Sequence, residues 1–297
     1  MVSGDLHMNK YLISTDSTAD LSAEYVKEHN IPIHPLYYYV NGEQYGAGRE
    51  LPLKEFFDGM RNDAKVSTSA STPEVCKQLF EQQVSEGYDV LHLGFSSGLS
   101  CSYQSACIAA EEVMESHPGS RIVVIDTLCA SGGQGLMVYY AVKLKEEGKS
   151  LDEVAQWVND NIQHLCHQFT VDDLKYLYRG GRISKTVQIL GTLINVKPVL
   201  HVDEAGKLIP VGNVRGRKKS LNALIDNMGA HIDGYDNDTI MITHGDCIED
   251  AEYVASQVKE RFGVKEVIIN YLSPTIGSHA GPGTIALFHL GDSRAIK

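Results

Sequence analysis

The segment 94–98, Gly-Phe-Ser-Ser-Gly, is the first place where residue types and spacing could do chemistry. It lies between an apolar run and a helical pattern, and it matches the G-x-S-x-G arrangement of a nucleophile elbow. Asp126, Asp246 and His279 follow in the chain, so one interpretation is a serine hydrolase, a lipase or thioesterase, that uses Ser96 with His279. However, residues 99–102 separate the pattern from the helix predicted to begin at Tyr103. Since an elbow turns directly into its helix, a polar loop that caps the helix stays open as an alternative.

Hydroxyl side chains offer a different interpretation. They gather in three segments that precede helical patterns, 15–18, 67–69 and 96–97. Hydroxyls and free N–H groups at a helix N-terminus bind an anion without covalent chemistry. Ser17 and Ser96 directly follow predicted parallel strands, and open α/β sheets bind ligands at that edge. The alternative is that several are N-caps, and Ser71 with Glu74 predicts a capping box.

Cationic groups supply further candidates. His279 lies in 277–283, Gly-Ser-His-Ala-Gly-Pro-Gly, a turn-rich segment just before a predicted strand, where the glycines let the backbone approach a ligand. Arg182 follows a Gly-Gly turn, and Arg215 begins a second basic cluster, 215–219. These arginines could clamp an anion or face an acidic partner, or they could be ordinary cations at element ends.

Metal and nucleotide sites are not predicted. His164, Cys166 and His167 lack a fourth ligand at useful spacing. The six cysteines show no C-x-x-C pair, which is typical of free thiols in a reducing compartment. Segment 178–186 lacks the glycines of a phosphate loop, and 132–135 does not match a dinucleotide fingerprint.

Composition narrows the partners. The chain has 297 residues, with 38 Asp and Glu against 26 Lys and Arg, which gives a formal charge of −12. Such a surface repels phosphate backbones and anionic membranes, so we expect no nucleic-acid partner. Since no long apolar run and no secretory signal are present, we expect no membrane segment and a cytoplasmic location.

Predicted strands and helices, which must position these residues, alternate in the first half of the chain. Apolar runs predict strands at 9–14, 31–40, 88–95 and 121–126, and Asn41-Gly42 predicts a hairpin to 43–45. Helical patterns cover 21–29, 54–61, 73–86, 103–115, 133–147 and 151–164, and the segment 66–72 is predicted to be a loop. Strands separated by helices of this length need crossovers, which favours a parallel, Rossmann-like sheet.

The pattern changes after residue 165. Strands are predicted at 169–171, 193–202, 207–215, 240–244, 267–272 and 284–290, with helices at 218–228 and 249–262. The turn 203–206 is short enough for an antiparallel hairpin. We therefore predict an α/β protein of two domains, an N-terminal parallel-sheet domain at 8–165 and a C-terminal α/β domain with a mixed or antiparallel sheet at 166–297.

Several motifs in this order resemble the DegV family of fatty-acid-binding proteins. They are Thr-Asp-Ser-Thr-Ala-Asp-Leu at 15–21, Thr-Ser at 68–69, Ser-Ser-Gly-Leu-Ser at 96–100, Val-Ile-Asp-Thr at 124–127, Tyr-Leu at 176–177 with Gly-Gly-Arg-Ile-Ser at 180–184, and His-Ala-Gly-Pro-Gly at 279–283. The resemblance spans essentially residues 9–291. The chain departs from the family at 67–71, where Lys-Thr-Ser-Gln-Pro is usual, and at 101, where cysteine replaces glycine.

The resemblance implies a long-chain fatty acid held between the two domains and no cofactor. Its carboxylate would be bonded by Thr68, Ser97 and His279, with Ser69 and Ser96 as neighbours. It also implies a carrier that presents the acid to a separate fatty acid kinase, which supplies ATP and makes the acyl-phosphate. Arg182 and Arg215 would then face the kinase or the phosphate. Because a buried carboxylate needs a counter-charge, we expect His279 to be protonated or to share a proton with the acid.

Overall fold

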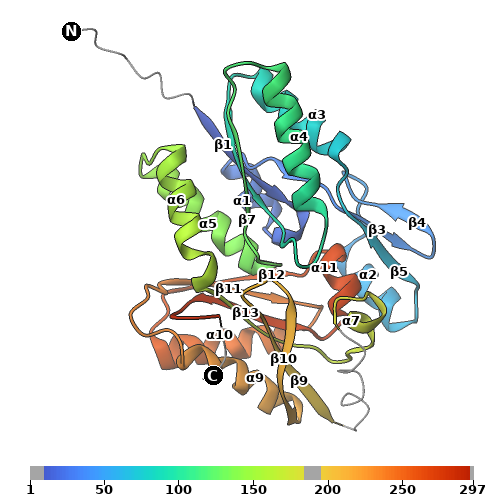
Figure 1. The fold of residues 1–297 in the computed structure, drawn as a ribbon. Coiled ribbons are helices and arrows are strands. Elements are labelled where there is room, and N and C mark those ends of the chain that lie inside the picture. The colour runs from blue at the N-terminus through green and yellow to red at the C-terminus, as the bar shows by residue number, and fades with distance from the viewer. Residues whose placement is uncertain (1–9, 184–194, 295–297) are drawn as a thin grey trace.

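The computed structural model describes residues 10–183 and 195–294, and the predicted parallel sheet is present in it. Four strands pair in parallel in the order β2–β1–β6–β7, namely β2 (Ile33–His34), β1 (Tyr11–Asp16), β6 (Asp89–Gly94) and β7 (Ile122–Asp126). Helices cover both faces, so every residue of these strands is buried or half-buried, including the polar ones. On one face lie α3 (Pro73–Ser85) and α4 (Ser102–Ser116), and on the other α5 (Gly132–Glu146) and α6 (Leu151–Asn161) (Figure 1).

The second sheet is mixed, as the sequence predicts. Its six strands run β10–β9–β8–β13–β11–β12, and only β11 and β12 pair in parallel. The strands are β8 (Leu165–Thr170), β9 (Val196–Val202), β10 (Leu208–Arg215), β11 (Thr239–His244), β12 (Glu266–Tyr271) and β13 (Ile285–Leu290). Helices α9 (Arg217–Gly229) and α10 (Ile248–Phe262) cover its outer face, at the bottom of Figure 1.

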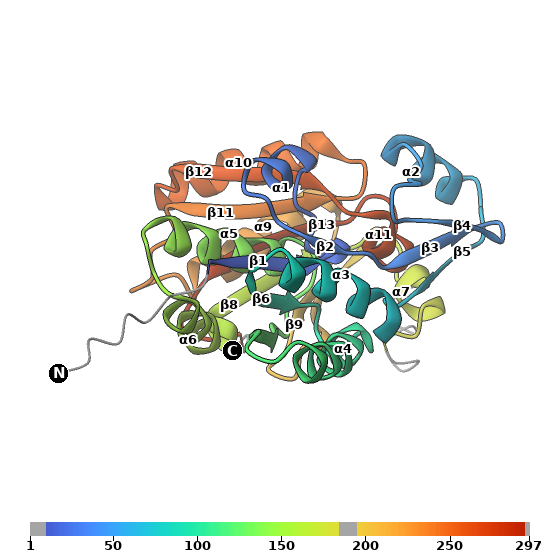
Figure 2. The same cartoon turned by 90° about the horizontal axis from the view of Figure 1, so that it is seen from above.

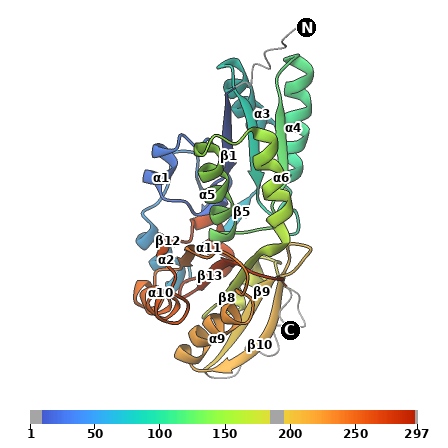
Figure 3. The same ribbon diagram turned by 90° about the vertical axis from the view of Figure 1, so that its left-hand side faces the viewer.

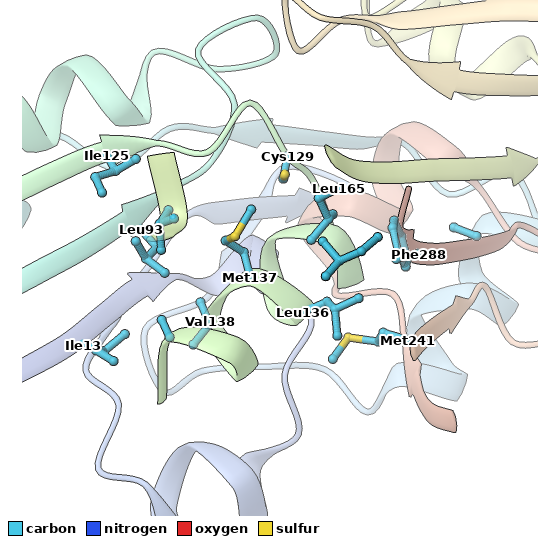
Figure 4. Packing of buried hydrophobic residues seen from close by; sticks show 14 of the residues in the cluster. Ile13, Leu93, Ile125, Cys129, Leu136, Met137, Val138, Leu165, Met241 and Phe288 are labelled. Atoms are coloured by element: carbon cyan, nitrogen blue, oxygen red, sulfur yellow. The ribbon is translucent and has the colours of Figure 1, made fainter. Parts of the chain in front are cut away.

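One core joins the two sheets. Helix α5 lies between them, and its Leu136 and Met137 are fully buried between Leu93 of the parallel sheet and Phe288 of the mixed sheet (Figure 4). The layers therefore run helix, sheet, helix, sheet, helix. In Figure 3, β8, β9 and α9 lie below β1 and α4. The domain boundary between residues 165 and 166 stays a prediction, and the shared core extends across it.

A third, small sheet corrects the sequence prediction. It has the order β4–β3–β5, with β3 (Tyr37–Val40), β4 (Glu43–Tyr45) and β5 (Val66–Ser69) (Figure 2). The predicted loop at 66–72 is thus wrong at its start, because its polar residues pair with β3, a partner that only tertiary structure supplies. The predicted strand 31–40 is split between two sheets. The N-cap of α3 is Thr72, whose hydroxyl accepts from the Val75 N–H, and not Ser71.

The remaining elements are short. They are the 3₁₀ turns η1 (Ser17–Ala19) and η2 (Ile162–His164) and the helices α1 (Ala23–Glu28), α2 (Leu53–Arg61), α7 (Lys175–Arg179) and α11 (Pro274–Ala280). No helix within 10–183 or 195–294 is long and apolar enough to cross a membrane.

Candidate functional site

An apolar cavity lies where the parallel sheet, the mixed sheet and α11 meet. Its empty volume is about 990 Å³, which includes solvent space at its mouth. Strands β8, β10 and β13 and the loops after β6 and β7 all contribute to its walls. The apolar side chains that line it include Leu36, Phe95, Leu99, Phe169, Leu177, Val202, Leu208, Ile276 and Phe288.

One end of the cavity, which we call the opening, is polar. Thr68, Arg182 and His279 line both the cavity and an adjoining polar pocket. The Thr68 hydroxyl and His279 Nε2 are hydrogen-bonded at 2.8 Å, although 211 positions separate the two residues. The opening is therefore the place where an apolar chain in the cavity could expose a polar head group.

Strand pairing places Thr68 at the opening. Thr68 on β5 pairs with Tyr38 on β3, and Tyr38 packs edge-on against Phe56 of α2 in a buried cluster. The same cluster includes Ala280, the last residue of α11. Because strand and helix share one apolar cluster, Thr68 and His279 are held side by side.

His279 lies in a helix and not in the predicted turn. Pro274 occupies the first turn of α11, and the Ser273 hydroxyl caps it by accepting from the Ile276 N–H. The imidazole packs against Gly180, where an added Cβ would lie 2.0 Å from His279 Nδ1. Gly180 is therefore required for this position of the ring, and the Gly-Gly turn of the sequence serves that contact.

The charge at the opening comes from arginine. Burial, and next the nearby positive charge of Arg182, lower the pKa of His279 from 6.5 to about 4. The imidazole is thus neutral near pH 7 without ligand. That His279 is protonated by a bound acid, or shares a proton with it, stays a prediction. Arg182 itself is exposed, and it donates from Nη1 to the Gly180 carbonyl at 2.5 Å and from Nε to the Leu99 carbonyl at 3.2 Å.

The serines of the 94–98 segment have other partners. Ser96 is fully buried, and its hydroxyl donates to the Gly206 carbonyl at 2.8 Å and accepts from the Gly98 N–H at 3.1 Å. This bonding anchors the β9–β10 turn, so the hydroxyl is not activated by a histidine and the hydrolase interpretation loses its nucleophile. Ser97 is exposed and donates its N–H to Asp126. Neither serine lines the cavity, whereas Ser69 does.

Arg215 lies away from the cavity wall. It is exposed at the end of β10, seven residues beyond Leu208, or roughly 23 Å along the strand. It lines neither the cavity nor the polar pocket. Its predicted role toward a partner stays a prediction.

A second part of the cavity wall, which we call the closed end because its residues are buried, holds residues that the sequence did not single out as ligand contacts. Ser131, His167 and Phe288 line it and are at most 5 % exposed. His167 Nε2 accepts the Ala130 N–H, its Nδ1 bonds the Leu165 carbonyl, and its ring stands edge-on to Phe288 at 5.3 Å. This histidine therefore forms part of a wall, and no metal-binding group is found among the described residues.

Comparison with known proteins places this arrangement in a family. The model described as "Uncharacterised protein, DegV family" matches residues 10–292. This chain belongs to the DegV family. A DegV domain-containing protein of Clostridium perfringens is 43 % identical over 97 % of this chain and 99 % of its own. Another from Lactococcus lactis is 39 % identical over 94 % of this chain and 97 % of its own.

Solved structures of DegV proteins share the whole fold. A fatty-acid-binding DegV protein from Thermus thermophilus superposes with a TM-score of 0.85 at 32 % identity, over 95 % of this chain and 99 % of that one. A stearic-acid-binding protein from Eubacterium ventriosum gives 0.87 at 27 % identity, over 95 % and 98 %. The α/β fold and the family resemblance are thus confirmed, and fatty acid binding is a described property of DegV relatives.

Proposed function

We propose that this protein is a carrier that binds one long-chain fatty acid, with its tail in the cavity and its carboxylate at the opening. The observation that carries the proposal is the continuity of an apolar cavity with a polar pocket at Thr68, Arg182 and His279. At about 0.8 kcal/mol per buried methylene, a sixteen-carbon tail offers roughly 12 kcal/mol before the costs of association. The head group then needs only a few well-placed bonds.

The proposed head-group site uses a hydroxyl, a neutral imidazole and a guanidinium. While the bond between Thr68 and a neutral His279 persists, one of the two can donate to the carboxylate. The donor is the Thr68 hydroxyl when Nε2 carries the imidazole proton, or the Nδ1–H group when Thr68 donates to Nε2. Arg182 supplies the counter-charge that neutral His279 does not. Ser69 lies beside Thr68 in the cavity wall. Ser96 and Ser97 act in this proposal through the conformation of their loop, and direct contact by either stays a prediction.

The second part of the proposal is presentation of the acid to a fatty acid kinase. The polar pocket next to the opening is lined by Lys65, Arg179 and Arg182 against a single acidic residue, Asp63. This local excess of positive charge in a chain of net charge −12 suits a phosphoryl group on the carboxylate. Arg215 would contribute to the surface that meets the kinase. Such a role also requires a cytoplasmic location, where ATP is available.

Two assays test the two parts. Titration calorimetry with palmitate and oleate should give saturable one-to-one binding. Incubation of the loaded protein with ATP and a bacterial fatty acid kinase catalytic subunit should give acyl-phosphate, trapped by hydroxylamine as the hydroxamate. Arg182→Gln should reduce hydroxamate formation more than it weakens palmitate binding. Tight binding without any hydroxamate would contradict the presentation role and leave the carrier role standing.

A further inference from the structure

The carboxyl group of Asp20 is buried outside the proposed head-group site. Asp20 belongs to the 15–21 motif, is 6 % exposed, and adopts a left-handed backbone conformation with φ of 52°. Among the described residues it forms no ion pair, and all its partners are neutral. A buried carboxyl group is costly, so its position needs an explanation beyond packing.

The hydrogen bonds of Asp20 connect both walls of the cavity. Oδ1 accepts from the Ser273 N–H at 2.9 Å, at the N-cap of α11. Oδ2 accepts from the Ser131 hydroxyl at 2.5 Å, at the N-cap of α5, and that hydroxyl also bonds Thr243 at 2.8 Å. The Asp20 carbonyl accepts from the Asn270 side chain of β12. One residue thus connects α11, α5 and the edge of the mixed sheet.

The two helices joined in this way line the cavity on different sides. Ser131 belongs to the closed end, whereas α11 contributes Thr275, Ile276 and, at its other end, His279. We propose that Asp20 is a positioning residue for lipid binding, which fixes α11 and its His279 relative to the closed end of the cavity. The proposal rests on the proposed fatty acid function.

The surroundings of Asp20 allow the link to persist in both protonation states. Burial raises its pKa to about 7, against the bonds from Ser131 and Ser273 that lower it. When the Asp20 carboxyl group is protonated, its Oδ2–H group can donate to the Ser131 hydroxyl, which in turn donates to Thr243. Oδ1 still accepts from the Ser273 N–H. An asparagine can copy this protonated arrangement, whereas alanine removes it.

Other titratable groups on the elements around Asp20 are engaged elsewhere. On β11, His244 Nδ1 accepts the Cys247 N–H, and on β12 the Tyr271 hydroxyl donates to Asp246. On β1, Asp16 accepts the Phe95 N–H, and on α11 His279 bonds Thr68. A change in affinity near pH 7 that disappears in Asp20→Asn would therefore report on Asp20 itself.

The test is palmitate affinity between pH 6 and 8 for the wild type, Asp20→Ala, Asp20→Asn and Ser220→Ala. Ser220 is a fully buried control whose hydroxyl donates to the Arg217 carbonyl on α9. A tail packed beside Ser131 raises the free-energy cost of ionising the Asp20 carboxyl group. Wild-type affinity for palmitate should therefore fall severalfold from pH 6 to 8. Asp20→Asn should bind like the wild type at pH 6 and lose the pH dependence. Asp20→Ala should bind about tenfold more weakly, while Ser220→Ala should lower only the melting temperature.

The outcomes separate the two proposals. If the wild type binds palmitate and Asp20→Ala binds it equally well, with a lower melting temperature alone, the positioning role is wrong. If Asp20→Ala does not fold, the test is the pH dependence of palmitate affinity in the wild type and in Asp20→Asn. Identical pH profiles for these two proteins would show that the positioning role is wrong. If the wild type binds no fatty acid at any pH, the proposed function itself fails.

Discussion

The two ends of the cavity satisfy their polar atoms in different ways. At the closed end, Ser131 and both ring nitrogens of His167 bond other protein groups. At the opening, His279 Nδ1 has no partner among the described residues, and Arg182 reaches solvent. Buried polar groups are normally paired. The closed end, whose polar atoms already have hydrogen-bond partners, therefore suits a hydrocarbon, and the opening, which keeps an unpartnered nitrogen, suits a head group. Under the proposed function, this difference sets the direction of the fatty acid.

The strongest challenge to this comparison is Gly180→Ala. The added Cβ would lie 2.0 Å from His279 Nδ1, so the imidazole must leave its position beside Thr68. Overpacking of this kind costs about 1–3 kcal/mol, and palmitate affinity should fall roughly ten- to a hundredfold in calorimetry. Gly212→Ala adds the same methyl group where nothing lies within 4 Å, and it should bind normally. Equal affinities for the two variants would contradict the role given to the opening.

Thr68→Val removes one hydroxyl and keeps the shape of the side chain. His279 Nε2 then loses its 2.8 Å partner, and the carboxylate loses one donor. A hydrogen bond of this kind is worth about 1–1.5 kcal/mol, which predicts a roughly tenfold weaker binding of palmitate. Thr239→Val serves as the control. It makes the same change at the first residue of β11, where the hydroxyl is bonded to Glu266. Unchanged affinity in Thr68→Val would mean that the head group lies elsewhere.

Phe288→Leu tests the closed end. The smaller side chain should leave room for a longer tail, so the ratio of stearate to palmitate affinity should rise by about fourfold per added methylene accommodated. Phe80→Leu, at an equally buried position between α3 and the parallel sheet, should destabilise the fold without changing that ratio. A constant ratio in Phe288→Leu would show that Phe288 does not limit chain length.

The smallest expected effect is on stability against pH. The pKa of His279 is about 4 in the fold and 6.5 in the unfolded chain, so the unfolded state takes up the proton first as the pH falls. The His279 contribution to stability is therefore present above pH 6.5 and is lost progressively between 6.5 and 4. As the pH is lowered from 7 to 5, the melting temperature of the wild type should fall more than that of His279→Gln. A constant difference would contradict the buried, neutral imidazole.

The sequence predicts much of this structure but not all of it. Apolar runs and helical spacing predict both sheets, because strands buried on two faces have a distinctive composition. The family resemblance implies that Thr68 and His279 share one site, and their mutual hydrogen bond is a finding of the structure, since no local pattern relates residues 211 positions apart. The sequence does not predict β5, because a Ser-Thr-Ser run forms a strand here only through pairing with β3. The burial of Ser96 depends on the β9–β10 turn, a contact that depends on how the two sheets pack.

The central claim is that this chain carries a single fatty acid, and mass spectrometry of the purified protein tests it most directly. A native spectrum should show a retained ligand, and a denaturing spectrum should identify one long-chain fatty acid per chain. Delipidated protein should bind palmitate or oleate again with the same stoichiometry. A protein that carries no lipid and binds neither acid would contradict the claim.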